Sequence, residues 1–331
     1  MTRKLHPRPI VSLAAALLLS SPLALHAQQV KLVQHASTMD VQIDGKLFTT
    51  YHFNDDFFHE PVRPFLWPVT ASDGVKVTTD QQQTDPSHGY QRSIWIAHAD
   101  VNGSNQWKFK TDPLAKQVHL KFDWVKQDSF QEELAWTDKT GKPILQEARM
   151  LRFHAYPDGV RSIEFNMTLT AVGGDVVLGT KGDRGLLSVR ALESLYHEPV
   201  FTSAEGTDSC QTPDPPKGKD EDEAKDEPRV PGIHTAWCDE SGPIDGSTYG
   251  IAIFDHPSNP RHPTLWHAHR DARLTPDMFS LDKSAKGDAH QGAYTIPAGK
   301  SLTLRYEVVI HKGPASGAGL KEKYAEFSAS K

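Results

Sequence analysis

Three long segments of this chain alternate apolar and polar side chains with a period of two residues. They span Val118–Trp124, Ile163–Ala171 and Leu302–Ile310. Successive side chains of an extended chain point to opposite faces, so the alternation predicts strands with one face in a core and the other toward solvent or a cleft. A chain patterned in this way folds mainly as β-structure.

The connections between these segments support the same conclusion. Turn-forming pairs such as Asp73-Gly74 and Asn102-Gly103 separate the predicted strands. One helix is predicted, over residues 319–328 near the C-terminus. Many strands with almost no helix predict an all-β fold, a large antiparallel β-sandwich. We expect a single domain over residues 28–331, with a charged, proline-rich insert at about residues 211–232.

The N-terminal segment is typical of a secretory signal. Arg3, Lys4 and Arg8 precede the apolar run 10–19, and a small-residue cleavage pattern ends at Ala27. The run is much shorter than the roughly 20 residues that cross a bilayer. We therefore expect cleavage after Ala27, export to the periplasm or the cell exterior, and no membrane insertion of the mature chain.

The charge of the chain bears on its partners. The formal net charge is −6, and it becomes −9 without residues 1–27, because that segment carries three Lys and Arg residues and no acid. A protein that binds nucleic acid shows clustered Lys and Arg residues, so no nucleic-acid partner is predicted.

Two cysteines, Cys210 and Cys238, flank the charged insert. Export places them where disulfides persist, and they lack the CxxC spacing of redox or metal sites. A bridge between them closes a loop of about 29 residues. On the chain-entropy model such a loop stabilises the fold by roughly 3–4 kcal/mol. We predict a structural disulfide.

The densest group of polar residues lies in the segment Phe254–His269, FDHPSNPRHPTLWHAH. It directly follows a strand-like run, and its three prolines restrict the backbone. A segment with so little freedom suits a pre-organised site, although a stiff surface loop with solvated histidines is the plain alternative. The residues that we predict to be catalytic are Asp255, His256, His262 and His267, with Arg261 and Trp266 as substrate-binding residues.

Two kinds of chemistry fit these histidines. Imidazole titrates near neutrality, which suits general acid/base catalysis, with Asp255 and Arg261 orienting the rings. His267 and His269 are two residues apart and point the same way in a strand, so with His256 or His262 they also suit zinc or copper. The spacing matches no strong metal signature, so we expect no metal cofactor and keep zinc or copper as the alternative. Trp266 is either an apolar surface on which a sugar ring lies or a residue of the core.

A second polar cluster spans residues 85–102. His88 and Arg92 lie in a glycine-containing turn, and the arginine offers a rigid fork of donors for carboxylates or paired hydroxyls. His98 follows in a predicted strand, where a histidine is commonly a satisfied core residue. We predict His88, Arg92, His98 and Asn102 as substrate-binding residues.

Polar pairs also occur on the predicted strands, as in Glu147/Arg149 and Glu164/Asn166. On the polar faces of neighbouring strands, cross-strand ion pairing explains them. A carboxylate buried in a cleft on such a face also suits a general base.

Several segments together resemble a bacterial family of unknown function that carries the label "methane oxygenase PmoA". They include Arg63–Pro68, His88–Trp107, Leu145–Arg149, Gly250–His267 and Arg305–His311. The resemblance covers nearly all of the mature chain and implies a shared fold and a recurring set of His, Arg, Asp and Asn residues. The chain departs from the family at Ala268-His269, where Val-Arg is usual.

A shorter motif is similar to the aldose 1-epimerase-like proteins. Arg63, then Trp67-Pro68, then His88-Gly-Tyr-Gln-Arg92 follow their R…WP…HGxxR arrangement. This likeness implies a galactose-mutarotase-like β-sandwich that binds sugar in an open cleft. We therefore expect an exported, carbohydrate-active protein, first as an enzyme acting on a sugar or glycoside. The alternatives are a non-catalytic glycan-binding protein and a copper- or zinc-dependent oxidative enzyme.

Overall fold

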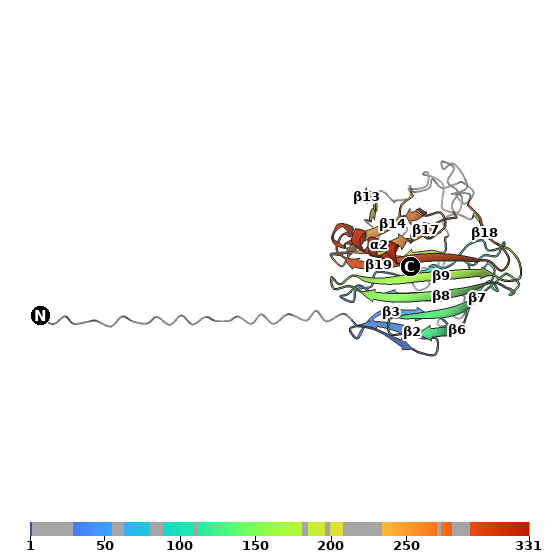
Figure 1. Cartoon of the computed structure of the whole chain (residues 1–331), viewed down its shortest axis with the longest axis horizontal. Coiled ribbons are helices and arrows are strands. Elements are labelled where there is room, and N and C mark those ends of the chain that lie inside the picture. Colours follow the sequence, from blue (N-terminus) through green and yellow to red (C-terminus); the bar gives the residue numbers. More distant parts are fainter. Residues whose placement is uncertain are drawn as a thin grey trace.

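A computed structural model describes Met1 and residues 29–54, 63–79, 89–108, 111–180, 185–195, 199–207, 234–269, 273–279 and 292–330. The predicted signal segment after Met1 and the whole predicted insert lie outside the described residues. Within the described part of the chain, two large antiparallel sheets dominate the fold (Figure 1).

The first sheet has eight described strands. In spatial order they are β1 (Val30–Gln34), β2 (Thr38–Ile43), β3 (Lys46–His52), β4 (Phe65–Val69), β5 (Ile94–Ile96), β11 (Leu187–Arg190), β17 (Arg273–Asp277) and β16 (Leu265–His269). The chain enters this sheet three times, so strands far apart in sequence become neighbours.

The second sheet has nine described strands. In spatial order they are β13 (Gly206–Thr207), β12 (Val200–Ser203), β14 (Trp237–Ile244), β15 (Ser247–Asp255), β19 (Ser301–Lys312), β9 (Arg161–Ala171), β8 (Pro143–Ala155), β7 (Ser129–Thr137) and β6 (Gln117–Val125). Figure 1 shows β19, β9, β8 and β7 running side by side across the middle of the molecule.

Smaller elements complete the described structure. A two-stranded sheet pairs β10 (Val176–Leu178) with β18 (Tyr294–Ile296). Two 3₁₀ turns, η2 (Glu193–Leu195) and η5 (Ala315–Gly317), lie between strands or before the last helix. The helix α2 (Leu320–Ala329) is the last described element.

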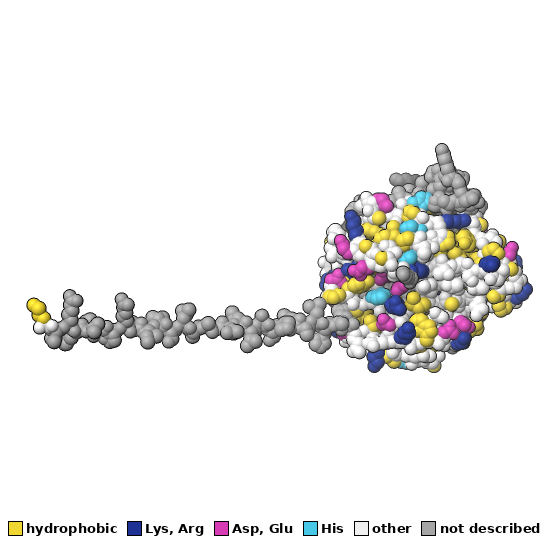
Figure 2. Space-filling view, in the orientation of Figure 1, with side chains coloured by type: hydrophobic (Ala, Val, Ile, Leu, Met, Phe, Trp, Pro, Cys, Tyr) yellow, Lys and Arg dark blue, Asp and Glu magenta, His cyan; other side chains and the backbone are white. Residues whose placement is uncertain are grey.

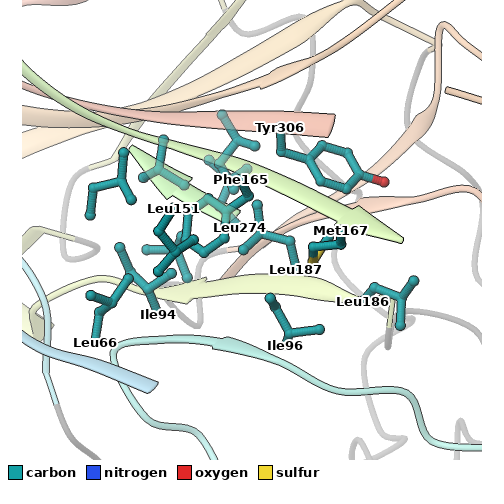
Figure 3. Packing of buried hydrophobic residues seen from close by; sticks show 14 of the residues in the cluster. Leu66, Ile94, Ile96, Leu151, Phe165, Met167, Leu186, Leu187, Leu274 and Tyr306 are labelled. Atoms are coloured by element: carbon teal, nitrogen blue, oxygen red, sulfur yellow. The ribbon is translucent and has the colours of Figure 1, made fainter. Parts of the chain in front are cut away.

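The two large sheets pack face to face through a shared apolar core. Leu151, Phe165 and Met167 of the nine-stranded sheet meet Ile94 and Leu187 of the eight-stranded sheet (Figure 3). Burying an aliphatic or aromatic side chain of this size stabilises a fold by about 1.5–3 kcal/mol, so this layer is the main source of stability. The predicted all-β fold, a large antiparallel sandwich, is confirmed.

Two of the three alternating segments are packed as predicted. The apolar residues of β9 and β19, including Leu169 and Leu304, are buried in the core. The helix predicted over residues 319–328 is also present as α2. Leu320 and Phe327 are buried and Tyr324 packs beside them on the outer face of the nine-stranded sheet, against Phe254.

For the third alternating segment the predicted buried face is wrong. In β6, Val118 and Leu120 are exposed, the latter 53% exposed. This strand is at the edge of the sheet, and its register with β7 shifts twice, between His119 and Lys121 and again between Phe122 and Trp124. Each shift reverses which face a side chain takes, so the alternation no longer follows the core.

The pair Glu147/Arg149 also lies on the other face from the one predicted. Both side chains are buried and share the core side of β8 with Leu151. Arg149 donates from Nε to Oε1 of Glu147 over 2.7 Å within one strand, and its Nη1 lies 3.8 Å from Oε1 of Glu132 on the neighbouring strand β7. The expected ion pair is present, but inside the sandwich.

The described surface is mixed in charge. Figure 2 shows Lys, Arg, Asp and Glu side chains interspersed on one face of the molecule. Among the described residues, no helix is long and apolar enough to cross a membrane.

Candidate functional site

Aromatic rings gather on the outer face of the eight-stranded sheet. Ile94 and Ile96 face the core, so Trp95 between them points outward. Phe65 of β4 is the cross-strand partner of Trp95, and the ring of Trp107 contacts that of Trp95 edge to face at 5.3 Å. All three rings are buried and form one cluster on this side of the sheet.

Four arginines surround these rings. Arg190 of β11 and Arg273 of β17 are directly opposite each other in neighbouring strands. The Cζ atom of Arg92 lies 3.7 Å from the centre of the Phe65 ring, and that of Arg273 lies 5.5 Å from the centre of the Trp107 ring. A guanidinium over an aromatic face is an attractive arrangement that partly offsets its burial.

Arg63 is the fourth arginine and holds the chain around the rings. It donates to the carbonyl oxygens of Tyr90, Gln106 (2.8 Å) and Trp107 (3.0 Å). Burial, and then the positive charge of Arg92, lowers the pKa of Arg63 to about 9. Arg63 and Arg92 are therefore close enough to repel each other. We call Arg63, Arg92, Arg190 and Arg273 with Phe65, Trp95 and Trp107 the arginine–aromatic face.

His267 of β16 adjoins this face. Nη2 of Arg273 donates to its Nε2 over 2.6 Å, and His267 is buried. Because a guanidinium only donates, Nε2 of His267 acts as the acceptor and the ring is neutral.

The margin of the arginine–aromatic face is partly exposed. His52 stacks on Phe65 with ring centres 4.5 Å apart, and Nζ of Lys108 lies 5.3 Å from the centre of the Tyr90 ring. These residues and Trp67 are half-buried. The margin thus consists of partly buried rings with Lys108 over Tyr90 and Lys76 over Trp67.

Asp255 and His262 form a second group of polar residues. Asp255 is the last residue of β15 and only 1% exposed, whereas the side chain of His262 is 18% exposed. Nδ1 of His262 lies 2.7 Å from Oδ2 of Asp255, and Nδ2 of Asn259 donates to Oδ1 over 2.7 Å. Asn259 is itself fixed by the backbone of Arg305. The carboxylate holds the histidine as the Nδ1–H tautomer, which leaves Nε2 as an acceptor.

The Asp255–His262 pair lies at one end of the strands that carry Arg273 and His267. Asp277 is the last residue of β17, four residues after Arg273. Its cross-strand partner in β16 is Leu265, which comes three residues after His262. Burial, then the charges of Asp255 and Asp277, raise the pKa of Tyr306 well above its usual value. The two carboxylates are therefore near one tyrosine. Four residues of a strand span about 13 Å, which is the distance along β17 from Arg273 to Asp277.

The other predicted residues of this segment have structural contacts. Arg261 donates to the carbonyl oxygens of Met278, Gly292 and Ala293 at 2.6–2.9 Å. Trp266 is buried in the core and donates to the carbonyl oxygen of Thr235 over 2.9 Å.

His256 lies at the end of the nine-stranded sheet, on the outer face that packs against α2. Its Nδ1 accepts from the backbone N–H of Ser258 over 3.1 Å, so Nε2 carries the proton and donates to the carbonyl oxygen of Ser330 over 3.2 Å, and the ring packs on Phe327. Burial, then the charge of Arg305, lowers the pKa of His256 below its usual value. The ring is thus held neutral.

The second predicted cluster is divided. Arg92 joins the arginine–aromatic face. His98 is fully buried, with Nε2 2.9 Å from the carbonyl oxygen of Gly179. Asn102 lies in a turn at φ 50° and bonds the backbone of Asp175 and Val177.

Some predicted residues fall outside the description. His88, Cys210 and the side chain of His269 lie outside the described residues. Cys238 is buried in β14 and is not a free thiol, and its pairing with Cys210 stays a prediction. Within the described ranges, no group of three or more His, Cys, Asp or Glu side chains is placed to hold a metal ion.

Sequence reasoning missed most of the arginine–aromatic face. Arg63 and Phe65 were noted only as part of a family resemblance, and Arg190 and Arg273 carry no local motif. They meet because β11 joins β5 to β17. Asp255 and His262 were found because they are seven residues apart.

The fold and these polar groups define a large antiparallel β-sandwich protein. Within that class, the chain belongs to the family of unknown function DUF6807, whose model matches residues 38–325. The description of this family assigns no function and does not carry the methane oxygenase label. No curated protein matches the chain.

Solved structures with a related outline were also found, all at low similarity. A galactose mutarotase-like protein from Clostridium acetobutylicum is 10% identical, with a TM-score of 0.36, over 87% of this chain and 99% of the other. An aldose epimerase homologue from C. elegans is 8% identical, with a TM-score of 0.30, over 87% and 99%. An α-galactosidase from Lactobacillus brevis is 9% identical, with a TM-score of 0.35, over 86% and 39%. At these values the likeness says nothing about activity.

Proposed function

We propose that this protein is exported and acts on a sugar or glycoside, with His262 as a general acid/base activated by Asp255. The ligand lies against the arginine–aromatic face. Export follows from the signal pattern of residues 1–27.

The observation that carries this proposal is the Asp255–His262 pair. Nδ1 of His262 donates to a buried carboxylate, and no hydrogen bond to its Nε2 occurs among the described residues. A carboxylate in this position orients the imidazole and stabilises the imidazolium that forms when Nε2 takes a proton. His262 is the more exposed member of the pair, at 18% against 1%, so it is the one that meets the substrate.

The assignment to carbohydrate rests on the composition of the arginine–aromatic face. Ligand sites combine aromatic walls with a few fixed polar groups, and arginine forks bind paired oxygens. Trp67 and Tyr90 at the margin are half-buried rings on which the C–H face of a sugar can lie.

The test is a panel of reducing sugars and glycosides followed by NMR for anomeric exchange or bond cleavage. His262→Asn should lower turnover at least about 100-fold with little change in the melting temperature. The matched control is His35→Asn, a half-exposed histidine in the β1–β2 turn that bonds Asp40. A folded His262→Asn protein with full activity would falsify the assignment.

A second candidate is a glycan-binding protein without catalysis. It is favoured by His267, which accepts from Arg273, and by His256, whose pKa is lowered by burial, since both rings are held neutral. This candidate predicts saturable sugar binding with no change in the NMR spectrum of the ligand over long incubation.

A further inference from the structure

Tyr306 of β19 is a buried tyrosine whose hydroxyl makes no hydrogen bond within the described part of the chain. The residue is 2% exposed and belongs to the main apolar core. Its cross-strand partner in β9 is Phe165, and Figure 3 shows the hydroxyl directed away from that residue. A buried polar group without a partner is rare in native proteins, and each one calls for an explanation, such as a functional role.

Tyr306 lies beside the carboxylate that holds His262. It is directly opposite Asp255 in the neighbouring strand β15. Two residues away along each strand, Ile253 and Val308 are also opposite each other, and both are buried in the core. Side chains two residues apart in a strand point the same way, so those of Asp255 and Tyr306 share the inner side of the nine-stranded sheet. The Cβ atoms of such opposite residues are about 4.5–5.5 Å apart.

The Asp255–His262 pair and Tyr306 bring together an acceptor and a donor. Oδ1 of Asp255 accepts from Asn259 and Oδ2 from Nδ1 of His262, which leaves Nε2 of the imidazole as an acceptor. Burial, then the charges of Asp255 and Asp277, raises the pKa of Tyr306 well above its usual value. The phenol therefore stays protonated at neutral pH and keeps its hydrogen for a ligand.

We propose that the hydroxyl of Tyr306 donates a hydrogen bond to the substrate, at an oxygen next to the group that Nε2 of His262 contacts. This inference rests on the carbohydrate function proposed above. One acceptor and one donor beside a shared carboxylate fit two neighbouring oxygens of a sugar, one that donates and one that accepts. A buried donor discriminates against a ligand that lacks its acceptor, because the donor is then left unpaired. Tyr306 is thus a specificity-determining residue.

The experiment compares Tyr306→Phe with the unaltered protein by isothermal titration. The probes are D-glucose, D-galactose and D-mannose, followed by analogues of the tightest binder that each lack one oxygen, the ring oxygen included. Tyr306→Phe should weaken the tightest binder roughly tenfold, as expected for the loss of one buried hydrogen bond. The analogue that lacks the oxygen accepting from Tyr306 should bind both proteins equally, which assigns the contact to one pair of atoms.

Thermal unfolding tests the state of the hydroxyl without a ligand. Tyr306→Phe should melt at or above the temperature of the unaltered protein, because it removes a polar group that has no partner among the described residues. The matched control is Tyr51→Phe, since Tyr51 is 1% exposed and its hydroxyl bonds Glu132 and Arg149. That variant should melt at a lower temperature and leave the affinity for sugar unchanged.

The outcomes separate this inference from the proposed function. Unchanged sugar affinity in Tyr306→Phe, with turnover lost in His262→Asn, overturns the role of Tyr306 and leaves the carbohydrate function standing. An equal loss of affinity for the parent sugar and every analogue also overturns it, as does a melting temperature lowered as far as in Tyr51→Phe. Binding of none of the sugars by the unaltered protein contradicts both.

Discussion

Glu164 of β9 and Glu307 of β19 are directly opposite each other in neighbouring strands. Their surroundings move their pKa values in opposite directions. The contact with His154, whose Nε2 lies 3.6 Å from Oε2, and then a hydrogen bond from Arg305 hold the pKa of Glu164 below its usual value. Burial raises the pKa of Glu307, and the charge of Glu164 adds to that effect. The pKa values of the two carboxylates are therefore moved apart although they occupy equivalent places in the sheet.

Glu307→Gln should stabilise the protein increasingly as the pH rises from 4 to 8. The native pKa of Glu307 is above the unfolded value, so the stability from its protonated form is present below that unfolded value. It is lost as the pH rises through the native pKa. Glutamine cannot ionise and still accepts from Ser162 and Tyr156. Melting temperatures across the pH range test this, and a gain that shrinks with rising pH would contradict it.

Glu164→Gln should show the opposite dependence on pH. Its native pKa is lowered, so its stability is present above the unfolded value and is lost as the pH falls through the native pKa. The substitution weakens a 3.3 Å contact with Arg305 and should cost about 1 kcal/mol near neutral pH, after allowance for solvent screening. That cost should disappear in acid. If the stabilities of the two glutamine variants changed with pH in the same direction, Glu164 and Glu307 would not have pKa values shifted in opposite directions.

Leu169→Ala and Leu120→Ala should differ strongly in stability although both leucines come from the same sequence pattern. Leu169 is 1% exposed in the core, and its truncation should cost about 2–5 kcal/mol. Leu120 is exposed at the sheet edge, and its truncation should change stability by less than about 0.5 kcal/mol. Urea unfolding of both variants measures the difference. Equal losses would mean that β6 is covered in solution.

This contrast shows why the sequence predicted the fold class but not which face of every strand is buried. Alternation identifies a strand from its own residues, and it placed β9 and β19 correctly. Whether a strand is at an edge depends on distant pairing, and among the described strands β6 pairs with β7 alone. The register shifts in β6 also have no local signal.

The candidate site was likewise predicted only in part. Asp255 and His262 were predictable because a short, proline-rich turn brings them together. Arg63 and Arg273 are more than 200 residues apart in sequence, and only the order of strands in the eight-stranded sheet unites them. His98 and Trp266 were predicted to bind substrate because their side chains suit that role, but both are buried and contact other parts of the protein.

The predicted disulfide makes a separate expectation. Cys210→Ser should lower stability by roughly 3–4 kcal/mol, because the reduced chain gains the entropy of a loop of about 29 residues. Reductant should lower the unaltered protein to the same level and leave the variant unchanged. Peptide mapping without reduction is the direct check, and a free Cys210 thiol would refute the bridge.

Arg149→Met should be strongly destabilising, by about 3–5 kcal/mol, because it leaves a buried carboxylate without its partner. Arg149 donates to both oxygens of Glu147 at 2.7 and 2.8 Å and contacts Tyr51 and Gln117 between the sheets.

The matched control is the double variant Glu147→Gln/Arg149→Met. Glutamine removes the charge and still accepts from Trp136, which lies 2.7 Å from Glu147. The double variant should therefore recover much of the loss, since replacing both members of a buried ion pair is far less costly than removing one. Urea unfolding of the wild type, both single variants and the double variant gives the coupling energy. If the single and double variants lose the same stability, the isolated charge of Glu147 is not the cause, and the loss comes from packing around Arg149 or from the buried Glu132, which loses its 3.8 Å ion pair with Arg149 in both variants.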